Sequence, residues 1–496
     1  MRLENQSSTA IDKVRASRDG HTYHETWAAR IALGLLYPST TLRAITVEGF
    51  SLEDEPSLSD AATEIADLVR YRGTTEIASA TSVEVLQFKY SIARHDIEMR
   101  AFDIKKTLQK FAKTESDFIG QVGIDRVEAV VRYEIVTNRP FSPTLIAAVE
   151  GLSQGQTLEG DAADQAKYIK EALSDIGDRL PSLLKRIVLN GTQGTLTEAR
   201  ALVRRTLADW STPNDPLTRL RLANLRDLVH EKAGSKGQHN NLIDRVAVLA
   251  CLEVDDERDL FPTPDAFPAV PKLIERPAID ELVAKIKEGG DPLLVDAPGG
   301  MGKTVLMQSL AQRLSGDNAV VLFDCYGGGS WRDPADGRHL PEKALPHIAN
   351  LLAVSGLCDI LIPGPAGPDL VRAFRRRLEH SVKSLRNTNR SSSVFLILDA
   401  IDHAALQAKA THSLSFAHDV LLSLSIAPIE GVVVIASCRT ERRDLARSDA
   451  TCRRFEVPPL SEPEASAIAQ AHYSDVTTLM AISIKPRNIT THQRTR

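Results

Sequence analysis

Hydrophobic and polar residues in the first part of the chain follow helical spacing and strand spacing in turn. Apolar side chains recur at helical intervals over residues 23–36, which favours a helix with one buried face. Three strand-like segments follow, at residues 42–50, 64–71 and 83–91. A charged helical stretch over residues 93–113 and a strand candidate at 127–138 come next. The pattern predicts the order helix, three strands, helix, strand.

The later part of the chain has a different pattern. Residues 142–252 are mostly helical in their spacing, and an acidic, proline-rich segment follows at 254–279. Proline lacks a backbone N–H and disfavours helix at the residue before it, so we expect a connector there. Beyond it, apolar runs alternate with helical stretches; the runs are LLVDA (293–297), VVLFD (320–324), VFLILD (394–399) and VVVIAS (432–437). This alternation is typical of a parallel sheet with crossover helices.

These patterns predict a multidomain α/β protein. We expect an N-terminal α/β domain with a helical extension over residues 1–255, followed by a linker over 256–275. A second α/β domain, with a parallel sheet and flanking helices, is expected over residues 276–476, and an irregular tail over 477–496.

Composition narrows the classes of protein. The net charge of −5 over 496 residues excludes a global basic field, so any nucleic-acid contact must come from local patches. The five cysteines show no CxxC or Cys/His spacing, which argues against a zinc site and fits a reducing cytosol. The N-terminus is polar, and no apolar run approaches the roughly 20 residues of a membrane helix. We therefore expect a soluble cytoplasmic protein without a membrane partner.

The segment APGGMGKT (297–304) indicates a nucleotide-phosphate site. It follows a strand-like run and precedes a helical pattern, as a P-loop requires, although Ala297 replaces the first glycine. Glycines let backbone N–H groups wrap phosphates, the lysine reaches the β- and γ-phosphates, and the hydroxyl holds Mg²⁺. The cradle residues are Gly299, Gly300, Gly302, Lys303 and Thr304. The expected cofactors are ATP and Mg²⁺.

Two later strands supply partners for this cradle. Asp399 ends a continuous apolar run and is predicted to hold Mg²⁺ together with Thr304. Asp402 either polarises the attacking water or caps a helix. Arg439, at the end of a third buried strand, either senses the γ-phosphate or forms a surface salt bridge.

The second domain contains the segments APGGMGKT, LILDAIDHA, IASCRTER and Asp324 through His339. With these segments it resembles STAND-type signalling NTPases, and more narrowly those of bacterial antiviral (Avs-like) defence proteins. The resemblance covers roughly residues 272–474. It implies an ATP-driven switch in which a sensor detects a foreign molecule, the chain forms a homo-oligomer, and an N-terminal effector acts. Because the winged-helix and repeat sensor segments implied by the family do not follow within the 496 residues, we expect either a separate sensor for a phage-derived trigger or a truncated product.

The order of elements in the N-terminal domain resembles that of restriction-endonuclease-like folds, and Gln87 and Lys89 resemble the QxK variant of the PD-(D/E)xK superfamily. Strand alternation places both side chains on one face. The resemblance implies a catalytic site of Asp67, Gln87 and Lys89, with Asp67 and Gln87 as metal ligands and Glu25 and Glu48 as further carboxylates. The alternative is a set of ordinary strand charges. His24 is predicted to be a surface or cap residue.

The leading hypothesis is an ATP-controlled, Mg²⁺-dependent endonuclease that cuts double-stranded DNA in antiviral defence. The alternative is an ATP-dependent signalling scaffold whose N-terminal domain only binds nucleic acid or a partner. A third possibility is a housekeeping ATPase with high basal turnover.

Overall fold

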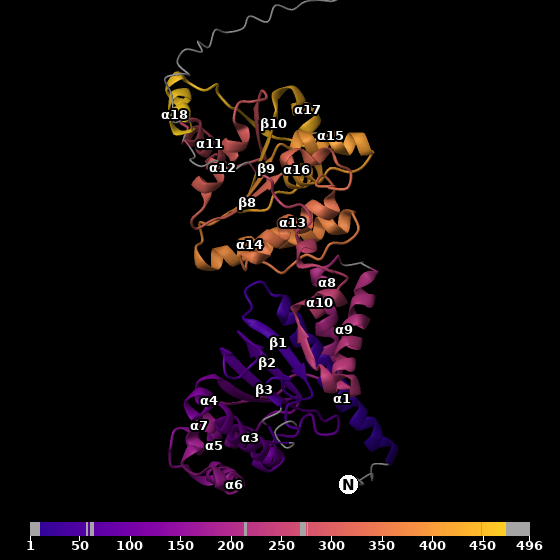
Figure 1. Cartoon of the computed structure of the whole chain (residues 1–496), viewed down its shortest axis with the longest axis vertical. Coiled ribbons are helices and arrows are strands. Elements are labelled where there is room, and N and C mark those ends of the chain that lie inside the picture. Colours follow the sequence, from indigo (N-terminus) through magenta and orange to yellow (C-terminus); the bar gives the residue numbers. More distant parts are fainter. Residues whose placement is uncertain are drawn as a thin grey trace, which may run out of the picture. The chain divides into compact units, whose positions relative to one another are not determined.

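The computed structural model describes residues 10–55, 58–59, 64–212, 216–267, 274, 276–447 and 449–472. The predicted tail at 477–496 lies outside these residues, as do positions 268–273 and 275 of the predicted linker. The chain divides into two compact units (Figure 1). Unit 1 comprises residues 1–261 and 353–373, and unit 2 comprises residues 262–352 and 374–496.

Unit 1 is built on a mixed six-stranded sheet in the order β5-β4-β3-β2-β1-β6. The strands are β1 (Leu42–Val47), β2 (Leu68–Arg72), β3 (Ser82–Lys89), β4 (Val131–Thr137), β5 (Ile187–Asn190) and β6 (Leu242–Asp244). β1, β2 and β3 pair antiparallel, whereas β3, β4 and β5 pair parallel. The predicted order of helix, three strands, helix and strand is therefore present.

Helices cover both faces of this sheet (Figure 1). One core contains apolar residues of α3 (Ala101–Val122), α4 (Ile124–Val130), α5 (Pro143–Ser153), α6 (Gly160–Ala172) and α7 (Leu180–Lys185). The other contains residues of α1 (Ala10–Leu33), α8 (Leu196–Trp210), α9 (Leu217–Ala233) and α10 (Arg245–Cys251). Val85 of β3 packs into the first core and Phe88 into the second, as strand alternation predicts.

Several predicted boundaries differ from the structure. The strand expected at 64–71 begins only at Leu68, so Asp67 precedes β2. The helix expected at 93–113 begins at Ala101, because residues 91–98 form turns and an exposed loop. Residues 124–130 form α4 before β4 begins. The short strands β5 and β6 lie within the stretch predicted to be mostly helical. The sequence pattern missed them because four and three residues are too few to show a period of two.

Unit 1 has a second segment, residues 353–373, which the predicted domain boundaries placed in the second domain. Ile360 and Ile362 of this segment are buried in the same core as α1, α8 and α9. The Ile362 N–H donates to the carbonyl of Trp210 at 2.8 Å. A segment distant in sequence therefore completes the core of unit 1.

Unit 2 is built on a five-stranded sheet in the order β11-β7-β10-β9-β8. The strands are β7 (Leu293–Ala297), β8 (Ala319–Asp324), β9 (Val394–Asp399), β10 (Val432–Arg439) and β11 (Arg453–Glu456). Every pair is parallel, as the continuous apolar runs predicted. All carboxyl ends therefore meet at one edge of the sheet.

The helices of unit 2 precede, connect or follow these strands. They are α11 (Ala278–Lys287), α12 (Lys303–Leu314), α13 (Pro341–Val354), α14 (Pro368–Thr388), α15 (Ile401–Thr411), α16 (Phe416–Ile426), α17 (Arg443–Arg447) and α18 (Glu462–His472), with the ends of α13 and α14 that fall within 353–373 belonging to unit 1. Among the helices that the structure describes, none combines the length and apolar character needed to cross a bilayer.

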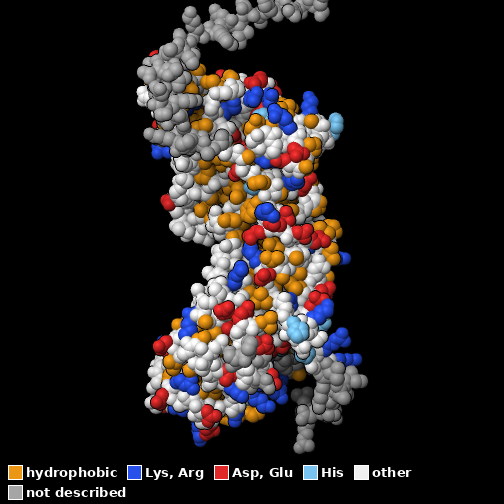
Figure 2. Space-filling view, in the orientation of Figure 1, with side chains coloured by type: hydrophobic (Ala, Val, Ile, Leu, Met, Phe, Trp, Pro, Cys, Tyr) orange, Lys and Arg blue, Asp and Glu red, His pale blue; other side chains and the backbone are white. Residues whose placement is uncertain are grey.

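Charged side chains of both signs are interspersed on the molecular face shown in Figure 2. No broad field of one sign is visible on that face, in keeping with the small net charge of −5. Any anion-binding site must therefore be formed by a local group of basic side chains.

Replacement of Ile362 by alanine is expected to destabilise unit 1 by about 2–4 kcal/mol, because it leaves a cavity in a buried apolar site. Urea unfolding should be followed by tryptophan fluorescence in a Trp331→Phe background, where Trp27 and Trp210 of unit 1 are the remaining tryptophans. Val354→Ala is the matched control, since Val354 is 60% exposed. Equal midpoints for the two variants would contradict the packing of 353–373 into unit 1.

Candidate functional site

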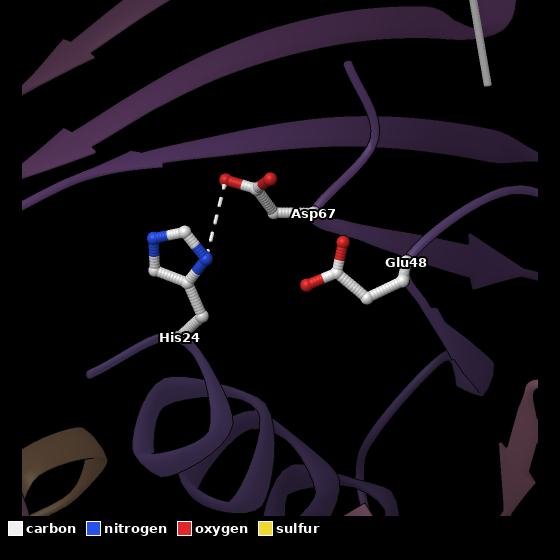
Figure 3. Close-up of side chains that lie close together, drawn as sticks. All are labelled: His24, Glu48 and Asp67. Carbon is white, nitrogen blue, oxygen red and sulfur yellow. Dashed lines mark ion pairs between the residues drawn. The ribbon is translucent and has the colours of Figure 1, made fainter. Parts of the chain in front are cut away.

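Three potential metal ligands meet in unit 1. One ligand atom each from His24, Glu48 and Asp67 lies within 4.8 Å of the others. His24 projects from α1, Glu48 follows β1 and Asp67 precedes β2, and their side chains point into one space (Figure 3). Three segments that are separated in sequence thus form one polar group.

The pairing of β1 with β2 explains why the two carboxylates are neighbours. Val47 pairs with Leu68, so the next residue after β1 and the residue before β2 are opposite each other. The pairing continues irregularly, with the Glu48 N–H donating to the Asp67 carbonyl at 3.0 Å. Glu48 has φ of 51°, an uncommon conformation for a residue with a side chain. Such backbone strain is frequent where a side chain is held for function.

Asp67 is held in a buried position at 8% exposure. Its Oδ2 accepts hydrogen bonds from the Phe88 N–H at 2.6 Å and from the Gln87 amide, and it lies 3.7 Å from His24 Nδ1. Burial raises the pKa of Asp67 to about 8, with a further contribution from the charge of Glu48. A buried carboxylate beside a second carboxylate favours a proton or a cation between them.

Gln87 and Lys89 share one face of β3, as the sequence predicted, with Phe88 on the other. The Gln87 amide nitrogen donates to Asp67, so this side chain orients the carboxylate. Rotation of the amide by half a turn would present its oxygen to a cation instead. Burial lowers the pKa of Lys89, while the nearby charge of Asp67 acts in the opposite direction.

Glu25 was predicted to be a carboxylate of the site and His24 a surface or cap residue, whereas the structure places His24 in the metal group and Glu25 outside it. Glu25 pairs with His230 of α9 at 2.8 Å between Oε1 and Nδ1 and does not join the metal group. The prediction that His24 is a surface or cap residue is wrong, because it faces Asp67. Helical spacing could have predicted this inward position of His24, because Trp27 and Ala28, one turn further along α1, are buried.

The chemistry of this donor set fits a divalent cation. Two carboxylates match the oxygen preference of Mg²⁺ and Mn²⁺. Burial lowers the pKa of His24 to about 4, with a smaller contribution from His21. His24 is therefore neutral near pH 7 and can offer a ring nitrogen, which transition metals accept more readily than Mg²⁺.

The predicted nucleotide residues of unit 2 meet around one pocket of about 380 Å³. The pocket includes every residue predicted for this site: Gly299, Gly300, Gly302, Lys303, Thr304, Asp399, Asp402 and Arg439. Gly302 has φ of 74° and directly precedes α12, so the turn leads into the N-terminus of a 12-residue helix. Unpaired N–H groups at such an end favour phosphate.

Asp399 occupies the centre of this site. Its Oδ2 accepts a hydrogen bond from the Thr304 hydroxyl at 2.7 Å, and its Oδ1 accepts one from the Ser437 hydroxyl. Burial raises the pKa of Asp399, whereas these two hydrogen bonds lower it. In the sheet, β10 lies between β7, which leads into the glycine-rich turn, and β9, which ends at Asp399. Ser437 on β10 therefore joins the site.

Lys303 is folded back onto the turn that precedes it. Its Nζ donates to the carbonyls of Ala297 at 2.7 Å and Pro298 at 2.9 Å. Burial lowers the pKa of Lys303, and the charges of Asp402 and Asp399 oppose that shift. The hydroxyl of Thr304 and the carboxylate of Asp399 form an oxygen pair suited to Mg²⁺ beside this ammonium group.

Asp402 does not cap a helix, because Ala400 occupies the N-cap position of α15 without a side-chain cap. Arg442 pairs with Asp402 Oδ2 at 3.2 Å, whereas the buried Asp402 Oδ1 has no hydrogen-bond partner among the described residues. His403 is buried on α15 and lines the pocket. Its ring packs against Tyr326 and Trp331. The wall of the pocket thus holds a polar atom available to a ligand.

No protein-family model matches the chain, and no curated protein matches it. Among solved structures, it is similar to the Cap4 SAVED/CARF-domain containing receptor of Acinetobacter baumannii, with 11% identity over 80% of this chain and 93% of that chain at a TM-score of 0.28. The same receptor with the cyclic trinucleotide 2'3'3'-cAAA gives 9% identity, the same coverage of 80% and 93%, and the same TM-score of 0.28. At this TM-score no property of the receptor is transferred to this chain.

Asp67→Asn is expected to raise the thermal unfolding midpoint in EDTA at pH 8, with a gain that shrinks as the pH falls toward 4. The folded protein keeps a proton on Asp67 up to about pH 8, whereas the unfolded chain loses it near about pH 4. The folded state therefore binds more protons between these values, and stability falls as the pH rises. Thermal scans from pH 4.5 to 8.5 measure this, with the exposed Asp96→Asn as control. A gain independent of pH would contradict the raised pKa.

Lys303→Ala is expected to weaken binding of Mg²⁺–ATP by at least about tenfold, since it removes the ammonium group that contacts the glycine-rich turn. Isothermal titration measures the affinity. Lys287→Ala, an exposed lysine of α11, is the control. Unchanged affinity in the Lys303 variant would mean that this pocket does not bind the ATP phosphates.

Proposed function

We propose that the chain is an ATP-regulated, metal-dependent endonuclease for double-stranded DNA that acts in antiviral defence. The observation that carries the nuclease part is the meeting of Asp67, Gln87 and Lys89 with His24 and Glu48 at one edge of the sheet. Ordinary strand charges would be expected to face water, whereas here Asp67 is buried beside a second carboxylate.

Asp67, Glu48 and His24 would hold the divalent cation. When bound, such a cation supplies Lewis-acid activation of the scissile phosphate and of the attacking water. Gln87 keeps the Asp67 carboxylate in its position through the amide hydrogen bond. The half-buried ammonium of Lys89 stabilises the negative charge that develops on the phosphate oxygens, and its lowered pKa eases proton transfer at Nζ.

The regulatory part of the proposal is supported by the pocket of unit 2. Thr304, Asp399 and Lys303 form the set of groups that a Mg²⁺–nucleotide complex requires. ATP would favour an assembled state in which two nuclease units act on the two DNA strands. The defence role rests on the resemblance to STAND-type NTPases of antiviral proteins, and a foreign trigger or a separate sensor would start assembly.

A plasmid-cleavage assay with Mg²⁺ or Mn²⁺, in the presence and absence of ATP, tests this function. Cleavage is expected to fall at least about a hundredfold in Asp67→Ala and Lys89→Ala, because each removes a group that acts on the phosphate. Asp96→Ala, an exposed acid of the loop after β3, should cut normally. If Lys303→Ala also loses ATP-dependent cleavage, the nucleotide site is the switch. Full cleavage by the Lys89→Ala protein would contradict the proposed nuclease site.

A further inference from the structure

A second pocket lies within the helical layer of unit 1, formed by α1, α8 and α9. Its volume is about 310 Å³. Its walls come from facing stripes of the three helices: Thr26 and Ala29 of α1, Thr197, Arg200, Ala201, Val203 and Arg204 of α8, and Leu222 and Arg226 of α9. The intervals of three and four residues along each helix place these side chains on one face. Figure 1 shows α8, α9 and α1 packed together in this layer.

The pocket is separate from the candidate metal site. His24 faces Asp67 at the sheet, whereas Thr26 and Ala29, which lie roughly 140–200° around the same helix from His24, face the pocket. The mechanism proposed for DNA cleavage uses none of the residues that line it. The pocket therefore requires an explanation of its own.

Three arginines line the pocket without compensating acids. Among the described residues, Arg200, Arg204 and Arg226 have no ion pair or hydrogen bond, and no Asp or Glu side chain lines this pocket. Arg200 and Arg204 are one turn apart on α8, a spacing at which like charges repel. By contrast Arg205, the next residue of α8, points elsewhere and pairs with Asp209 at 3.7 Å. A group of like charges around a hollow concentrates positive potential and favours an anion.

The remaining lining is apolar. Ala29, Ala201, Val203 and Leu222 give the pocket a hydrophobic wall, and the hydroxyls of Thr26 and Thr197 add polar groups. Guanidinium groups bind phosphate through paired hydrogen bonds and also stack on planar rings. A volume near 310 Å³ falls at the lower end of the range for small-molecule sites, about 300–1,000 Å³.

We propose that this pocket binds a small phosphorylated ligand that carries an apolar or planar group, with a nucleoside monophosphate as the simplest example. The phosphate is bound by the three arginines and the planar group lies against the apolar wall. This site is distinct from the nucleotide pocket of unit 2, so unit 1 carries its own small-molecule site. The inference does not depend on the proposed nuclease activity.

Isothermal titration of AMP and of inorganic phosphate into the full chain tests the proposal. The Lys303→Ala background removes the lysine that is proposed to bind phosphate in the other pocket. AMP is expected to bind more tightly than inorganic phosphate, because only AMP reaches the apolar wall. Arg204→Glu should weaken AMP binding by at least about tenfold, since it removes a charge-assisted contact and adds a repulsive one. Arg204→Gln should produce a smaller loss in the same direction.

Arg205→Glu is the matched control, because it makes the same change one residue away and outside the pocket. It should bind AMP as the background protein does. Absence of AMP binding, or binding that is equal in the Arg204 and Arg205 variants, would overturn the proposal. A titration with a DNA duplex provides the remaining comparison. If Arg204→Glu weakens DNA binding and AMP does not bind, the arginines belong to a nucleic-acid surface, and the small-ligand proposal is wrong.

Discussion

The antiparallel register of β1, β2 and β3 is the constraint on which the candidate nuclease site depends. Val47 is paired with Leu68, and Leu68 with Leu86. This register sets Asp67 opposite Gln87, and it fixes the irregular end of β1 that presents Glu48. A shift of one residue would turn Asp67 to the other face of the sheet. The apolar residues of both faces resist such a shift, because each face is covered by helices.

The register also explains why the site is electrostatically unbalanced. Hydrophobic packing on both faces holds Asp67 where water has little access, and Glu48 is placed beside it by the strand pairing. The folding free energy comes from the packed faces, so the fold can maintain two neighbouring carboxylates that would otherwise separate. The same principle applies in unit 2, where burial raises the pKa of Asp399 at the end of a fully buried strand.

Sequence patterns predicted what depends on local spacing and on one strong motif. The parallel strands of unit 2 and the residues around the glycine-rich turn follow from continuous apolar runs and from the P-loop spacing. The shared face of Gln87 and Lys89 follows from strand alternation. In contrast, the roles of His24 and Glu25 depend on the rotation of α1 against the sheet and on His230, about 200 residues away. Tertiary packing decides such pairings, and no local pattern contains them.

Tertiary packing also decides the contacts of residues 262–267, which directly follow the first segment of unit 1 in the sequence. Asp324, at the end of β8, pairs in register with Asp399 of β9. The Ala266 N–H donates to Asp324 Oδ2, and the Asp324 N–H donates to Asp265 Oδ1, both at 3.3 Å. Burial raises the pKa of Asp265 to about 6, with the neighbouring Asp324 charge adding to the effect.

These contacts form a short physical path within unit 2. Tyr326 lines the nucleotide pocket only two residues after Asp324, and the Cys325 N–H donates to the Asp399 carbonyl at 3.0 Å. Residues 262–267, which directly follow the first segment of unit 1 in the sequence, are therefore held at the strand end that borders the nucleotide pocket.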